Sequence, residues 1–383
     1  MSDSLAIARR MLQRTGSHPV ISLFLDLDPA QFATAPARAS QARSLLDEAE
    51  RIGKHDALPH DDQAALRADL ERLDEYLASD DLPVSGARSL AVFCSRQDDL
   101  FETVALPEAL EPRVVIAPTP YVEPLVAGVA AGRWCVTLIS RRNGAIFAGD
   151  VPGLEEEEQV ADDVRGRPHR GGLSQANYQR GVDDDAERHL RHVAEDLYRL
   201  WQSESFHRLV LGGSEIDVDQ FREVIHNDLR PLLSDARLGL EPETATVAEV
   251  RAALVPLLAQ ERAATQTAAV SALTERVDRG ARAAVGIEPT LDALAQRRVE
   301  RLVLAVGFAA QGGRCLSCGL LYAAGTETCP VDGSALEPVA DLREAAVEAA
   351  VLQDAGVVIV GEGSEIPPSV LVRGAGIAAL LRF

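Results

Sequence analysis

The chain has 383 residues, enough for two or three domains that each bury their own hydrophobic core. Its 59 Asp and Glu residues outnumber 38 Lys and Arg residues, and the net charge of −21 argues against nonspecific nucleic-acid binding by the whole surface, though not against a local basic patch. No apolar run approaches the roughly 18–20 residues of a membrane span, and residues 5–8 are too short for a signal peptide, so we expect a cytoplasmic protein.

The first segment combines buried strands with amphipathic helices. Residues 20–27 and 89–95 read as strands, and residues 37–52 read as a helix. A second helix is indicated by four leucines that recur on one helical face: Leu66, Leu70, Leu73 and Leu77. Three prolines within residues 118–124 predict a domain boundary near residue 125.

The second segment has the pattern of an α/β domain. Residues 134–140 and 145–149 read as two strands joined by a hairpin turn at Arg141-Arg142-Asn143-Gly144. After an acidic run and a loop, a helix is expected from about Asp183–Asp185, since acidic residues suit a helix N-terminus. A strand at 208–211, a glycine turn and a helix at 218–229 follow, and an alanine-rich helix fills 247–280.

A basic loop lies between these elements, in a chain that is otherwise acidic. Guanidinium groups suit phosphate, and adjacent glycines let a backbone approach a ligand closely. The alternative is a solvated surface loop whose charge balances the neighbouring acidic runs, and the residue types alone favour that alternative. The candidate site residues of this loop are Arg165, Arg167, His169, Arg170, Gly171, Gly172, Leu173, Ser174, Gln175 and Arg180.

The third segment alternates helices and strands again, which predicts an α/β sandwich. The helices are expected at 290–297 and 342–353. The strands are expected at 299–306, 356–360 and 377–383.

A cysteine cluster interrupts this third segment. Cys315-Leu-Ser-Cys318-Gly319 is followed by Cys329-Pro-Val-Asp332-Gly333, with Asp332 where a fourth cysteine would stand. Zinc accepts carboxylate oxygen as well as thiolate, so we expect Cys315, Cys318, Cys329 and Asp332 to hold a structural zinc ion. The alternative is a decayed zinc ribbon that holds nothing. Cys94 and Cys135 read as ordinary buried cysteines.

Two histidines form a weaker candidate site. His189 and His192 lie three residues apart on the predicted helix and could share a metal ion. Such pairs more often belong to a solvated helix face, which is the interpretation we favour.

Several short motifs, taken in order, resemble one known family. They are Val20-Ile-Ser-Leu-Phe-Leu25, Leu90-Ala-Val-Phe-Cys94, Tyr121-Val-Glu-Pro-Leu125, His169-Arg-Gly-Gly-Leu-Ser-Gln-Ala-Asn-Tyr-Gln-Arg180, Leu209-Val-Leu-Gly-Gly-Ser214 and Gly376-Ile-Ala-Ala-Leu-Leu-Arg-Phe383. The chain resembles the eukaryotic and archaeal class-1 peptide chain release factors and their relative Pelota. It is most similar to the divergent prokaryotic release-factor-like proteins.

This resemblance implies an α/β (α+β) protein of three domains. The N-terminal domain would span residues 1–125, and the middle domain with the Gly-Gly loop 126–268. The C-terminal domain would span 269–383, with a zinc-ribbon-like insertion at 312–338, as in archaeal members. The resemblance also implies binding in the ribosomal A site, where the middle domain's loop would meet rRNA at the peptidyl-transferase centre. A translational GTPase such as elongation factor Tu would be a delivery partner, whereas no DNA or membrane partner is implied.

Two departures from the family bear on activity. Leu173 stands where the family's catalytic Gln positions water, and an alkyl group neither donates nor accepts a hydrogen bond. The family's Asn-Ile-Lys-Ser stop-codon motif has no counterpart, since the comparable stretch, 33–38, reads Ala-Thr-Ala-Pro-Ala-Arg. We therefore expect no stop-codon reading and a non-catalytic factor that acts in ribosome hibernation or rescue.

Two alternatives remain at this stage. The first is a peptidyl-tRNA hydrolase or release factor in which Gln175 replaces the missing glutamine, although catalytic positioning tolerates displacements of only about 1 Å. The second is a scaffold that does not bind ribosomes.

Overall fold

A computed structural model describes the chain except for residues 1–2, 15, 17, 29–31, 33, 56–59, 80–81, 83–85, 128–131, 163–174, 362–370 and 372. The side chains of residues 3, 55, 60, 127 and 175–183 also lie outside the described part. The chain divides into two compact units, one of residues 1–84, 88–130 and 259–383 and the other of residues 85–87 and 131–258. Within the described residues, no helix has the length and apolarity to cross a membrane.

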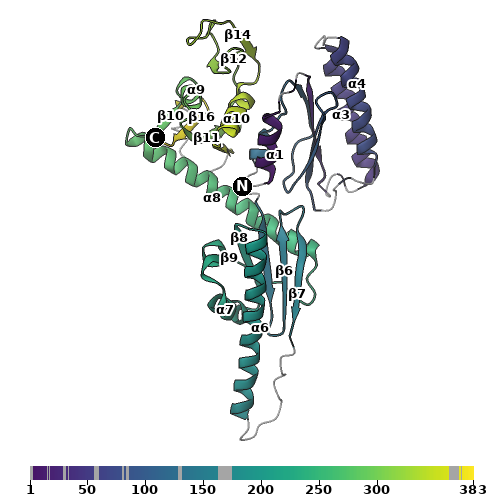
Figure 1. Ribbon diagram of the computed structural model, residues 1–383, viewed down its shortest axis with the longest axis vertical. Coiled ribbons are helices and arrows are strands. Elements are labelled where there is room, and N and C mark those ends of the chain that lie inside the picture. The colour runs from purple at the N-terminus through teal and green to yellow at the C-terminus, as the bar shows by residue number, and fades with distance from the viewer. Residues whose placement is uncertain are drawn as a thin grey trace. The chain divides into compact units, whose positions relative to one another are not determined.

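The amino-terminal sheet of the first unit is antiparallel, in the order β3-β2-β1-β4. Its two central strands are buried along their full length, as their mostly apolar sequences predict. Figure 1 shows two helices, α3 and α4, side by side on one face, where the predicted leucines Leu66, Leu73 and Leu77 are buried. The elements are β1 (Val20–Asp26), α3 (Ala35–His55), α4 (His60–Leu77), β2 (Ser89–Ser95), β3 (Leu100–Leu106) and β4 (Arg113–Ala117).

A second sheet of this unit has the order β10-β16-β11-β15, with only the β11–β15 pair parallel. The short strands β12, β13 and β14 form a separate three-stranded sheet where the zinc-ribbon-like insertion is predicted. The elements are β10 (Ala283–Val285), α9 (Ile287–Ala295), β11 (Val299–Ala305), β12 (Gly312–Cys315), β13 (Leu321–Ala323), β14 (Leu336–Val339), α10 (Leu342–Leu352), β15 (Gly356–Val360) and β16 (Ile377–Leu381).

A buried charged cluster joins α10 to the short helix α5 (Glu123–Ala127), and α1 (Asp3–Leu12) packs beside both helices. The Arg343 guanidinium donates to both carboxylate oxygens of Glu123, with Nε–Oε2 at 2.5 Å and Nη2–Oε1 at 2.9 Å. It also donates to the carbonyls of Ala305, Val306 and Phe308. Arg343 is 8 % exposed, so this arrangement satisfies a charge that water hardly reaches.

Glu344, next along α10, caps the start of α5. Its carboxylate accepts from the backbone amides of Val122, at 2.5 Å, and Glu123, at 3.3 Å. Burial raises the pKa of Glu344 well above its usual range. The hydrogen bond from the Val122 amide lowers this pKa, whereas the nearby carboxylates of Glu348 and Glu123 raise it further. The folded protein therefore holds a proton on Glu344 more tightly than the unfolded chain does.

A pH-dependent stability follows from this raised pKa. The contribution of Glu344 is fully present below its unfolded pKa, near 4.5, and is lost as pH rises through the folded value. Glu344→Gln keeps the acceptor and carries no charge, so its stability relative to wild type should increase as pH rises. Denaturant midpoints measured from pH 4.5 to pH 8 test this expectation. A difference between the two proteins that stays constant with pH would contradict it.

The second unit has a mixed five-stranded sheet in the order β7-β6-β5-β8-β9. β5, β8 and β9 run parallel, whereas β6 and β7 are antiparallel to their neighbours. The hairpin predicted at residues 141–144 is confirmed as the β5–β6 connection. The elements are β5 (Trp134–Ile139), β6 (Asn143–Gly149), β7 (Glu155–Ala161), α6 (Gln175–Ser203), β8 (Arg208–Gly213), α7 (Glu215–Val224), the 3₁₀ helix η1 (Asn227–Leu232), β9 (Leu233–Leu238) and α8 (Val247–Asp278).

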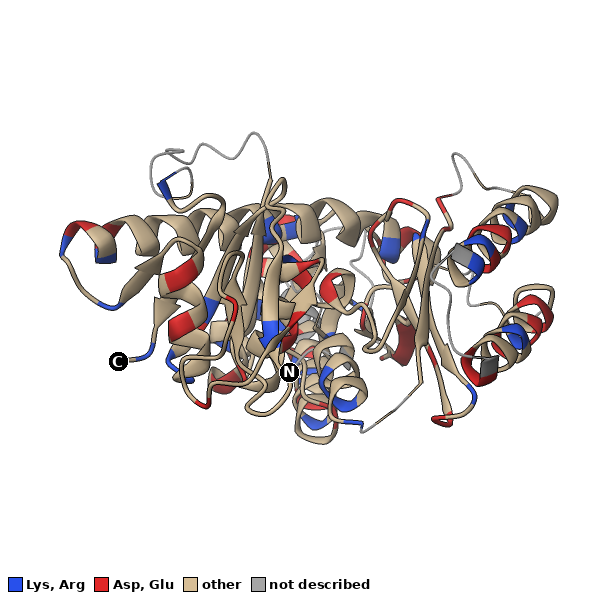
Figure 2. Ribbon diagram, turned by 90° about the horizontal axis from the view of Figure 1, so that it is seen from above, with Lys and Arg blue, Asp and Glu red and all other residues tan. Residues whose placement is uncertain are grey.

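The structure adds one strand to this unit and corrects one sequence prediction. The acidic run at 155–158 lies in the edge strand β7, whose charged side chains are mostly exposed and therefore lack the apolar alternation of a half-buried strand. The helix expected from Asp183 begins at Gln175, because the polar residues of its first turns form helix without an apolar period. Basic and acidic residues are interspersed along the described helices (Figure 2).

The α/β (α+β) fold class is confirmed, while the three predicted domain limits stay predictions. The predicted boundary at 268/269 lies inside the continuous helix α8. The second compact unit ends at residue 258 and the first resumes at residue 259, so this division also lies within the helix. A helix that crosses a boundary carries no proline-rich or glycine-rich linker to mark it in the sequence.

Candidate metal centre and the base of the glycine loop

The cysteine cluster is built from two turns with the same hydrogen-bond frame. In the first, Gly319 N donates to Cys315 O at 2.8 Å, and in the second, Gly333 N donates to Cys329 O at 2.8 Å. Both glycines have φ of +74°, a conformation that glycine adopts without steric cost. Asp332 thus holds the place in the second turn that Cys318 holds in the first.

The four predicted ligands converge in the structure. The Cys318 and Cys329 sulfurs are 3.6 Å apart, and Cys315 Sγ lies 3.5 Å from Asp332 Oδ2. Four zinc–sulfur bonds of about 2.3 Å in a tetrahedron would place sulfurs about 3.8 Å apart, so the spacing fits one ion. In the part of the chain that the structure describes, this is the one group of three or more candidate ligands within 4.8 Å of one another.

The surroundings of the cluster lower the pKa values of Asp332 and Cys329. The backbone amide of Ser334 donates to Asp332 Oδ1 at 2.9 Å, and this bond is the main cause of a pKa for Asp332 well below its usual range. The Tyr322 hydroxyl lies 3.2 Å from Cys329 Sγ. Because four protein side chains converge, the cluster could hold one metal ion and leaves no coordination position for a substrate.

The structure describes the backbone of only two of the candidate residues of the glycine loop. Arg165, Arg167, His169, Arg170, Gly171, Gly172, Leu173 and Ser174 lie outside the described residues. Gln175 is the first residue of α6 and Arg180 lies in its second turn, but their side chains are outside the described part. The roles assigned to all these residues therefore stay predictions.

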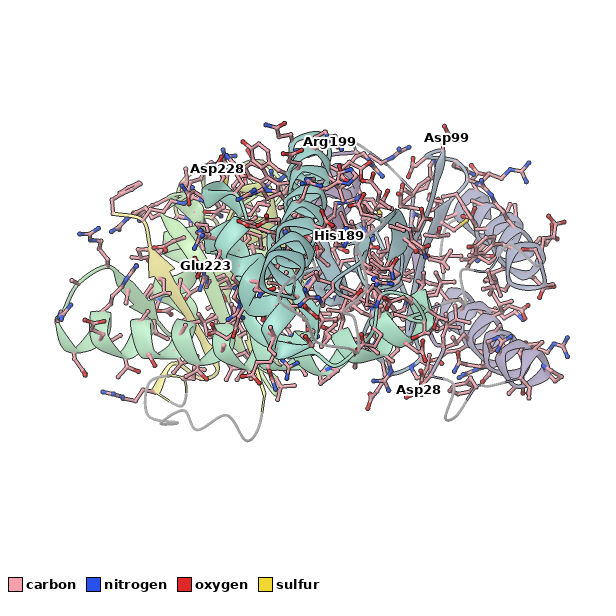
Figure 3. The ribbon with its side chains drawn as sticks, turned by 90° about the horizontal axis from the view of Figure 1, so that it is seen from below. Asp28, Asp99, His189, Arg199, Glu223 and Asp228 are labelled. Atoms are coloured by element: carbon pink, nitrogen blue, oxygen red, sulfur yellow. The ribbon has the colours of Figure 1, made fainter. Side chains whose placement is uncertain are left out.

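The described residues nearest this loop form a polar clamp on α6 that the sequence did not reveal. Asp162, the last described residue before the loop, has its Oδ2 atom 2.7 Å from His189 Nδ1 and 3.1 Å from His192 Nδ1. His189, labelled in Figure 3 on α6 viewed end-on, is 1 % exposed, so placing it on a solvated face was wrong. Its burial follows from packing in the core beneath α6, to which its polarity gives no clue.

We expect the clamp to contribute to the free energy of unfolding. The hydrogen bond from His189 is the main cause of the lowered pKa of Asp162, so this contribution is present above the ordinary pKa of 3.8 and is lost as pH falls through the folded value. At neutral pH, Asp162→Asn should lower the free energy of unfolding by about 0.5–1.5 kcal/mol, because the carboxylate is partly exposed. The matched control is Asp235→Asn, an exposed position on β9. Equal denaturant midpoints for both variants would contradict the clamp.

Comparisons with known proteins find one family that matches the middle part of the chain. Residues 120–282, which contain the basic loop and all of α6, match the sequence model of Bacterial archaeo-eukaryotic release factor family 10. This stretch of the chain is therefore similar to a family of release-factor-like proteins. A search of curated proteins finds no match.

Solved release-factor and Pelota structures are similar to this chain at low identity. The archaeal translation termination factor aRF1 is 16 % identical over 99 % of this chain and 97 % of that one, with a TM-score of 0.25. Pelota from Archaeoglobus fulgidus is 16 % identical over 77 % and 79 %, with a TM-score of 0.37. Dom34 from S. cerevisiae, a translation termination-like factor that interacts with Hbs1, is 8 % identical over 77 % and 79 %, with a TM-score of 0.39. Likeness at this level transfers no function.

Proposed function

We propose that this protein is a non-catalytic ribosome-binding factor that occupies the A site in hibernation or rescue. The observation that carries the proposal is the family match over residues 120–282, because this stretch includes the basic loop. Arg165, Arg167 and Arg170 would bind rRNA phosphate, since planar guanidinium forks suit phosphate oxygens. Gly171 and Gly172 would let the backbone approach the peptidyl-transferase centre closely.

The sequence of the same loop favours a factor that blocks the peptidyl-transferase centre over one that hydrolyses peptidyl-tRNA. The side chain of Leu173 cannot orient water, so it would fill the space that a catalytic glutamine needs. A factor with this loop would exclude substrates from the peptidyl-transferase centre. From the family resemblance alone, we further propose delivery by a translational GTPase such as elongation factor Tu.

We also propose that the cysteine cluster binds a zinc ion and that the role of this ion is structural. Three thiolates and one carboxylate form a donor set that zinc accepts in tetrahedral geometry. The ion would tie the two turns together in a three-stranded sheet that has little core of its own.

Binding to purified 70S ribosomes tests the proposed site of action. Ribosomes with a vacant A site should bind the protein, and ribosomes whose A site holds aminoacyl-tRNA should bind it at least ten-fold less well. Equal binding to both would contradict A-site occupancy.

A peptide-release assay on P-site peptidyl-tRNA separates blocking from catalysis. We expect no release above the buffer control, with wild type and Gln175→Ala behaving alike. Release by wild type that Gln175→Ala abolishes would instead establish the hydrolase.

A further inference from the structure

Two apolar side chains stand exposed at the tips of the metal-binding turns. Leu316 is 74 % exposed and Val331 is 69 % exposed, and these are the most exposed large apolar side chains in the described part of the chain. Leu316 follows Cys315, and Val331 precedes Asp332. Cys315 Sγ lies 3.5 Å from Asp332 Oδ2, so the sequence neighbours of Leu316 and Val331 are in contact.

Neither the metal centre nor the fold explains these two side chains. Metal binding uses the flanking cysteines and Asp332, and a position between two ligands on an exposed turn accepts polar residues equally well. The neighbouring position of the first turn is indeed Ser317. Paired apolar side chains that remain in water therefore point to burial against a partner, which would gain about 25 cal/mol for each Å² buried.

The charges around the tips restrict the chemistry of that partner. Within residues 312–339 the only basic residue is Arg314, and its guanidinium donates to Glu348 at 2.6 Å. The acidic residues Glu327, Asp332 and Glu337 are all exposed. A divalent ion bound by three thiolates and a carboxylate would itself carry a net charge of −2. This surface repels phosphate and attracts Lys and Arg.

We propose that Leu316 and Val331 form a docking surface for a basic protein segment with apolar side chains. This inference rests on the proposed function, under which the segment belongs to a ribosomal protein. The two features would then have different partners, because the arginine-rich loop would bind RNA while the acidic, apolar-tipped turns would bind protein.

Photo-crosslinking to purified 70S ribosomes tests the inference. A diazirine amino acid, which inserts into protein and RNA alike, is placed at position 316 or 331, with the exposed position Leu352 on α10 as control. Positions 316 and 331 should crosslink to the same Lys- and Arg-rich peptide of a ribosomal protein, and position 352 should not. Crosslinks to rRNA alone, or none from a protein that still co-sediments, would overturn the docking surface. Failure to co-sediment would overturn the proposed function and this inference with it.

A substitution experiment gives an independent measure. Leu316→Ser with Val331→Ser should weaken ribosome binding about 5–20-fold, while Leu352→Ser should leave it unchanged. Metal content determined for each protein separates lost docking from a damaged metal centre. Unchanged binding by the double variant with its metal retained would overturn the docking surface.

Discussion

Replacing Cys329 by serine is expected to remove bound zinc almost completely, from about one equivalent to less than a tenth. The Cys329 sulfur lies 3.6 Å from Cys318 Sγ, and a serine hydroxyl is a far weaker zinc ligand than a thiolate. Elemental analysis of the purified protein measures the zinc content directly. Cys135→Ala is the matched control, because it removes a buried cysteine in the other unit and should leave zinc unchanged.

Zinc that stayed at one equivalent in Cys329→Ser, or was absent from wild type purified without chelators, would contradict a Cys₃Asp centre. Asp332→Ala should lower zinc affinity as well. The folded remainder of the chain should survive both changes, since the ligands lie outside the two larger sheets of the first unit.

Arg343→Ala is expected to lower the free energy of unfolding by about 3–5 kcal/mol, because it leaves the Glu123 carboxylate without its buried partner. Three backbone carbonyls lose a donor at the same time. Denaturant titration measures the effect. Arg276→Ala is the matched control, since Arg276 also donates to a carboxylate (Glu300) and to a backbone carbonyl (Leu381) but its side chain is 31 % exposed, and it should cost about 0–1 kcal/mol.

A second variant separates buried charge from lost packing. Arg343→Met with Glu123→Leu removes both charges and keeps side-chain volume, so it should be more stable than Arg343→Ala alone. Equal losses for Arg343→Ala and Arg276→Ala would contradict the role assigned to the buried cluster.

Sequence spacing predicted the convergence of Cys315, Cys318, Cys329 and Asp332, because all four lie within eighteen residues and each turn fixes its own geometry. Apolar pattern and length likewise predicted the central strands β1, β2 and β5 and the helices α4 and α10, while alanine richness predicted α8. In these elements the local pattern and the tertiary environment agree.

Features that depend on distant partners could not be predicted in the same way. Arg343 and Glu123 are 220 residues apart, so nothing in either neighbourhood indicates the pair. The same holds for Asp162, which directly follows the strand β7, where acidic side chains obscure the apolar period. His189 is buried because of the sheet beneath α6, and a single polar residue in an amphipathic helix carries no signal of that burial.

The salt dependence of ribosome binding tests the central claim most directly. Three phosphate contacts should contribute a slope of about −2 to −3 to a plot of log affinity against log salt concentration. The triple variant Arg165→Ala, Arg167→Ala and Arg170→Ala should therefore bind 70S ribosomes more weakly and with a correspondingly shallower slope. The control Arg43→Ala, Arg51→Ala and Arg67→Ala changes three exposed arginines of α3 and α4 and should leave the slope unchanged. Absence of binding at low salt, or equal slopes for wild type and the loop variant, would contradict ribosome binding through the loop.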